Sequence, residues 1–72
     1  MVTKSDLTLW ERLENEMVDR DLTLVDTVKE MNTSYRTLVM IRDGNKPSTK
    51  IYSKICKFLG ESMLEVRKYR IE

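Results

Sequence analysis

The chain has 72 residues and a formal net charge of +1, with 40% hydrophobic and 35% charged residues. A chain of this length builds one small core and has no room for a cofactor domain beside a substrate domain. The hydrophobic content excludes a disordered tail, and no stretch approaches the roughly 20 apolar residues that cross a bilayer. Cys56 is the single cysteine, which excludes a disulfide-stapled scaffold and predicts a reducing, cytoplasmic setting without export.

The first two predicted helices follow apolar residues spaced three or four positions apart. Ser5 is the expected N-cap of the first helix, and Asp6 suits its first turn. The apolar positions of that helix are Leu9, Trp10, Leu13, Met17 and Val18. The second helix follows Thr23, which with Asp26 matches a capping pair. Its apolar positions are Val25, Val28 and Met31.

Three further helices are expected after the polar turn at Asn32 and Thr33. Ser34 caps a helix over 35–42, which turns Leu38 and Ile41 inward and stops at 43–44. The loop 43–48 precedes a helix that runs to Gly60, with apolar positions Ile51, Tyr52, Ile55, Phe58 and Leu59. Ser62 and Glu65 match a capping box, so a fifth helix follows, with apolar positions Leu64, Val66 and Tyr69. The sequence therefore predicts an all-α domain over 1–72 with five short helices around one core, in which the fifth helix either covers the core or mediates dimerisation.

Charge is divided unevenly along the chain. Residues 1–32 hold four basic and eight acidic side chains, a net charge of −4, whereas residues 33–60 hold six basic side chains and one acidic side chain, a net charge of +5. The basic segment could bind phosphate or complement an acidic partner, and the acidic half could mimic or complement a basic DNA-binding face, although a run of charges is usually only a solvated surface. The charge pattern alone leaves these alternatives open.

Several segments together resemble the helix-turn-helix family of the lambda-repressor and Cro type. They are Leu22-Thr23 before a helix, the polar turn, Ser34 with Thr37 and Leu38, the run from Ile41 to Ser48, and the ending from Ile55 to Gly60. The resemblance implies that the helix over 35–42 lies in the DNA major groove and reads base edges. By position, the reading side chains would be Leu24, Tyr35, Arg36, Val39, Met40 and Asn45.

This set of side chains departs from the family pattern. The family often has Gln where Leu24 and Tyr35 stand and a polar residue where Met40 stands, so Arg36 is the one strong reader of bases. Val39 and Met40 could turn partly into the core. However, successive residues of a helix are rotated by about 100°, and Leu38 and Ile41 already occupy the inward face. The core therefore cannot bury Val39, Met40 and Tyr35 as well. We therefore expect an exposed apolar and aromatic surface beside Arg36, which is typical of a protein-binding hot spot.

A second departure from the family pattern concerns Arg42. The family usually places Glu there, in an ion pair with an Arg of the first helix, and the matching position of the first helix here is Met17. Arg42 could instead reach Glu14 or Glu16, or it could stay solvated.

The chain is similar to the modulator-of-repression type within this family, and the resemblance implies a phage antirepressor. Such a protein binds the DNA-binding domain of its cognate repressor, blocks operator binding and favours lytic growth; the residues expected to bind are Leu24, Tyr35, Arg36, Val39 and Met40. The alternative is a Cro-like repressor that binds operator DNA through Arg36, Asn45, Lys46, Lys50 and Lys54. We expect no enzyme, cofactor or metal, because the chain has no His and Cys56 lies among apolar residues on its helix.

Overall fold

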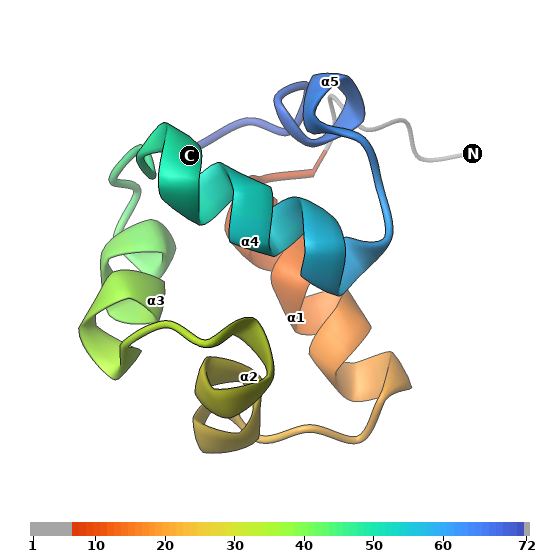
Figure 1. Ribbon diagram of the computed structural model, residues 1–72, viewed down its shortest axis with the longest axis vertical. Helices are drawn as coiled ribbons and strands as arrows, with labels where there is room; N and C mark the ends of the chain where they lie inside the picture. The colour runs from red at the N-terminus through yellow and green to blue at the C-terminus, as the bar shows by residue number, and fades with distance from the viewer. Residues whose placement is uncertain (1–6, 72) are drawn as a thin grey trace.

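The computed structural model describes residues 7–71, and in that range helices form all the regular structure apart from one isolated β-bridge (Figure 1). The helices are α1 (Leu9–Asp19), α2 (Leu24–Met31), α3 (Tyr35–Arg42), α4 (Thr49–Leu59) and α5 (Met63–Val66). Helix α4 packs against α2 and α5, while α3 packs against α1 and α2. The predicted all-helical fold with five short helices is confirmed.

Every one of these helices begins with a Ser or Thr cap. The predicted capping pair of α2 is confirmed, since Thr23 Oγ1 accepts from the backbone N–H of Asp26 at 3.1 Å and the Asp26 carboxylate accepts from the Thr23 N–H. The caps of α3, α4 and α5 are Ser34, Ser48 and Ser62. Because each hydroxyl satisfies a backbone donor that the helix leaves unpaired, the five starts are fixed locally by sequence.

Helix α1 starts later than the sequence led us to expect. Ser5 and Asp6 lie outside the described residues, and the N-cap of α1 is Thr8. Thr8 forms a reciprocal capping box with Glu11, in which each side chain accepts the other residue's backbone N–H at 3.1 Å. The prediction of Ser5 as the cap is therefore wrong, because Thr8 and Glu11 have the spacing that a capping box requires.

The core gathers apolar side chains from every helix and from the segment after α5. Its buried members are Leu9, Leu13, Met31, Leu38, Ile41, Tyr52, Ile55, Phe58, Leu59, Val66 and Tyr69. Three residues expected on apolar faces are exposed instead: Val18 by 78%, Val25 by 55% and Leu64 by 72%. Each lies at or near the end of its helix. A residue next to an inward-facing position is rotated from it by about 100°, and near a helix end no neighbouring helix covers it.

The segment after α5 returns to the start of α1. The backbone N–H of Leu9 donates to the Arg70 carbonyl at 2.6 Å, and the Arg70 N–H donates to the Leu7 carbonyl at 3.1 Å. Val66 at the end of α5 and Tyr69 in this segment are both buried. Helix α5 and the chain behind it therefore cover the core of their own molecule, which is one of the two roles expected for the fifth helix.

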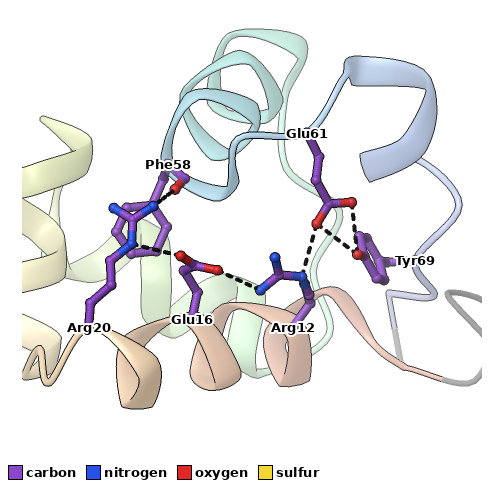
Figure 2. A network of polar contacts seen from close by, with 6 residues as sticks. All are labelled: Arg12, Glu16, Arg20, Phe58, Glu61 and Tyr69. Carbon is purple, nitrogen blue, oxygen red and sulfur yellow. Dashed lines mark hydrogen bonds and ion pairs between the residues drawn. The ribbon is translucent and has the colours of Figure 1, made fainter. Parts of the chain in front are cut away.

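A network of charged side chains connects α1 to the carboxyl end of α4 and to the segment around α5 (Figure 2). Arg12 Nη1 contacts Glu16 Oε1 and Arg12 Nε contacts Glu61 Oε2, both at 2.9 Å. Tyr69 donates its hydroxyl to the Glu61 carboxylate at 2.9 Å. Arg20 Nε contacts Glu16 Oε2 at 2.7 Å. The carboxylates of this network thus join residues that are nearly fifty positions apart in sequence.

Arg20 completes the network by holding the end of α4. Its guanidinium lies 4.6 Å from the centre of the Phe58 ring, and its Nη2 donates to the Phe58 carbonyl. A guanidinium at this distance from an aromatic ring gains a cation–π attraction and also satisfies a carbonyl near the helix end. Arg20 therefore connects the carboxyl end of α1 to the carboxyl end of α4.

Acid is expected to destabilise the fold through the carboxylates of these networks and caps. Desolvation opposes ionisation of Glu16, but hydrogen bonds from Arg20 and Arg12 outweigh it and hold the pKa of Glu16 below its ordinary value. The pKa of Glu11 and that of Asp26 are lowered mainly by the backbone N–H that each accepts from its N-cap residue. A carboxyl with a lowered pKa stabilises the folded state above its unfolded pKa and loses that contribution as the pH falls through the folded value.

The expected result is a stability that changes little between about pH 5.5 and 7, since the chain has no His, and that falls below about pH 4. Urea unfolding followed by circular dichroism at several pH values measures this. In the variant Glu16→Gln the fall should be smaller, because one of the responsible carboxyls is gone. Equal acid sensitivity in the variant and the wild type would show that Glu16 does not contribute to the loss of stability in acid.

Candidate interaction surface on the third helix

Helix α3 presents one apolar face to the core and another to solvent. Leu38 and Ile41 are 1% and 2% exposed, whereas Tyr35 is 53% and Met40 is 45% exposed. Val39 is half-buried and lies one turn after Tyr35, on the same side of α3. The expectation that the third helix leaves an aromatic and apolar surface in solvent is therefore confirmed, and Met40 does not turn into the core.

The other two residues expected on this surface differ in how available they are. Arg36 is exposed beside Tyr35 on the first turn of α3. Leu24 opens α2 and is half-buried, with part of its side chain packed against the core. The surface is thus formed mainly by Tyr35, Arg36 and Met40, and Leu24 adds less contact area than its position in the sequence predicts.

The residues proposed for DNA contact are divided between two places. Asn45 and Lys46 are exposed in the loop after α3, where Asn45 Nδ2 donates to the Met40 carbonyl at 3.1 Å, and Lys50 is exposed in the first turn of α4. Lys54 instead donates from Nζ to the Asn32 carbonyl at 2.6 Å, at the carboxyl end of α2. Lys54 therefore connects α4 to the end of α2, whereas the other three lie in the loop after α3 and at the start of α4.

A hollow that the sequence did not reveal lies between the end of α3 and the start of α4. Its volume is about 310 Å³, and its lining is mostly apolar. The residues around it are Thr37, Met40, Ile41, Asn45, Lys46, Pro47, Ser48 and Ile51. Because Met40 belongs both to this hollow and to the exposed face of α3, the two features form one continuous surface.

Arg42 does not reach helix α1. Its Nε lies 3.8 Å from Asp43 Oδ1, and both side chains are at least half exposed, so a contact of this kind contributes little to stability. Glu16 is instead paired with Arg12 and Arg20. Of the alternatives expected for Arg42, the ion pair with Glu16 is therefore contradicted, and the Arg42 side chain stays largely solvated.

Cys56 lies half-buried on α4, with its Sγ 4.0 Å from the Met63 sulfur. Burial raises the pKa of the Cys56 thiol, which keeps it protonated and unreactive at neutral pH. Its position thus agrees with a packing role against α5.

Across residues 7–71, no group of His, Cys, Asp or Glu side chains is arranged to hold a metal ion. Within the same range, none of the helices has the length and apolar character needed to cross a membrane. Comparisons of the chain with protein-family models, with curated proteins and with solved structures give no match.

Proposed function

We propose that α2, residues 32–34 and α3 form a helix-turn-helix, and that the chain is an antirepressor of a phage genetic switch. Two eight-residue helices that pack together across a three-residue connection support the first part. The resemblance of Leu22 to Gly60 to the lambda-repressor and Cro type supports the placement of this motif in the chain. The fold alone does not determine what the motif binds, so its partner is set by the side chains on its surface.

The observation that carries the proposal is the exposed apolar character of α3. Tyr35 and Met40 are about half exposed on the helix that would otherwise read bases, and Arg36 lies beside them. Base recognition needs hydrogen-bond donors and acceptors, and apolar contacts serve mainly at thymine methyl groups. Tyr and Arg are enriched in the centres of protein interfaces, where Met adapts its shape to the partner. The surface therefore favours a protein partner over DNA.

The proposed partner is the DNA-binding domain of the cognate repressor. An antirepressor that occupies this domain competes with operator DNA for it. The fraction of operator occupied by repressor therefore falls once the antirepressor concentration exceeds the dissociation constant of the antirepressor–repressor complex. The switch would then move toward lytic growth without any covalent chemistry. A site for a small-molecule ligand is not part of this mechanism.

Tyr35→Ala and Met40→Ala are each expected to weaken binding to the repressor domain by at least about 1 kcal/mol, which is roughly fivefold or more. The reason is that each truncation removes an apolar anchor from the interface. Isothermal titration with the purified repressor domain measures the effect, and a competition gel shift on operator DNA reports its consequence. Leu64→Ala is the matched control, since it removes an exposed apolar side chain from α5, outside the proposed interface. Unchanged affinity in both α3 variants would refute the proposal.

A Cro-like repressor that binds operator DNA directly is the second candidate. Arg36, Lys46 and Lys50 are exposed, and within residues 7–71 no carboxylate pairs with them. Such cations bind phosphates, with an affinity that falls steeply as salt rises. A gel shift with operator DNA and no repressor separates the two candidates. A specific complex at low salt that Arg36→Ala weakens would support direct binding and replace the antirepressor proposal.

A further inference from the structure

The hollow between α3 and α4 combines an apolar floor with a basic edge. Met40, Ile41, Pro47 and Ile51 supply the apolar lining, and Lys46 stands at its border. A volume of about 310 Å³ is near the lower limit for sites that enclose whole small-molecule ligands. An open hollow of this size suits one or two side chains of a partner. The matching partner surface would present an apolar side chain flanked by carboxylates.

One face of α1 in this same chain has that chemistry. Glu11, Glu14, Asn15 and Val18 line a shared face, since they follow one another at steps of three, one and three residues along the helix. Val18 is 78% exposed, the largest exposure given for any large hydrophobic residue of the described chain. Glu14 and Asp19 are exposed near it, and within residues 7–71 neither is joined to a cation. An apolar side chain thus projects into solvent between two unneutralised carboxylates.

We propose that the α1 face of one copy docks on the α3–α4 hollow of a second copy. Val18 enters the hollow against Met40 and Pro47, and Glu14 and Asp19 of the first copy lie beside Lys46 and Lys50 of the second. The charge division supports this pairing, since residues 1–32 carry −4 and residues 33–60 carry +5. Opposite charges across an interface attract the partners and select the orientation of docking.

The geometry makes this contact head-to-tail. The carboxyl half of α1 and the connection from α3 to α4 lie on different sides of the molecule (Figure 1). A copy therefore cannot satisfy its own hollow, and the resulting dimer keeps a free hollow on one copy and a free α1 face on the other. Interfaces of this heterologous kind extend into chains unless the rotation closes a ring. The oligomer should grow with concentration and shrink as salt screens its charges.

Self-association also covers Met40, which belongs to the surface proposed for the repressor. The form that binds repressor is then the monomer or the free end of a short oligomer. The inference itself does not rest on the antirepressor function, because its test needs this chain alone.

The experiment is sedimentation velocity of the full chain at low salt, from micromolar to millimolar concentration. The average mass of the wild type is expected to rise with concentration. Val18→Glu disables the α1 face, and the double variant Lys46→Glu with Lys50→Glu disables the hollow, so each is expected to remain a monomer. All three residues are exposed or border open space, and circular dichroism checks the fold of each variant. Leu64→Glu is the matched control on α5 and should associate like the wild type.

Mixing the two disabled variants provides the decisive result. One keeps an intact hollow and the other keeps an intact α1 face, so the mixture should form a dimer that cannot extend. A single chain that carries both reversals, Glu14→Lys with Asp19→Lys and Lys46→Glu with Lys50→Glu, restores opposite charges across the contact and should associate like the wild type. A wild type that stays monomeric at millimolar concentration, or a mixture of the two disabled variants that forms no dimer, would overturn the proposal. Self-association of each disabled variant would also overturn the proposal, because the contact would then involve neither the α1 face nor the hollow.

Discussion

Leu13→Ala is expected to lower the free energy of unfolding by about 2–5 kcal/mol. Leu13 is fully buried in α1, between the core residue Leu9 one turn before it and the partly buried Met17 one turn after it. Truncation removes apolar atoms from the core and leaves a cavity that a well-packed interior fills only in part. A domain of this length is stable by roughly 4–11 kcal/mol in total, so the substitution removes a large share of it.

Urea unfolding of the variant at neutral pH measures this loss. Leu64→Ala is the matched control because it removes the same atoms from a side chain that is 72% exposed. Its expected effect lies within about 0.5 kcal/mol of the wild type. Similar losses in the two variants would mean that burial does not distinguish these positions, contrary to the core described above.

Local signals in the sequence were sufficient for the helices and most of their starts. Thr23 with Asp26 and Ser34 with the backbone of residue 37 are contacts between residues three positions apart, so the sequence alone carries the information. The inward pair of α3, Leu38 and Ile41, was predicted for the same reason, since a three-residue step defines one side of a helix. The exposed character of Tyr35 and Met40 then followed.

Features that depend on how helices meet could not be predicted in this way. Thr27 is fully buried although it is polar, and its hydroxyl is satisfied by the Thr23 carbonyl at 2.9 Å. The pairing of Arg12 with Glu61 joins residues 49 positions apart, and no periodicity connects them. The hollow beside Met40 exists because of the path of the loop from α3 to α4, which no local pattern specifies. These features are set by tertiary packing, and the docking surfaces proposed for this chain depend on them.

The second large effect is expected at Arg12, where alanine should lower the free energy of unfolding by about 2–3 kcal/mol. Arg12 is the cation shared by Glu16 and Glu61, whose side chains are only 16% and 15% exposed. Its removal leaves Glu61 without this partner in a poorly hydrated place, and leaves Glu16 with Arg20 alone. Stranding a carboxylate in a fully buried pair costs about 3–5 kcal/mol, and the remaining solvent exposure reduces that figure here.

The matched control for Arg12→Ala is Lys68→Ala, which removes a cation from the exposed pair with Glu65 and should change stability by less than about 0.5 kcal/mol. The dependence on pH then separates charge from packing. As the pH falls through the lowered pKa of Glu16, this carboxyl becomes neutral, so the penalty of removing its cation shrinks and the variant should approach the wild type. A deficit that is equal at about pH 3 and pH 7 would instead assign the loss to the packing of the aliphatic stem of Arg12. The ion pairs would then orient the helices without adding stability, as buried charge networks do in proteins where apolar replacements are tolerated.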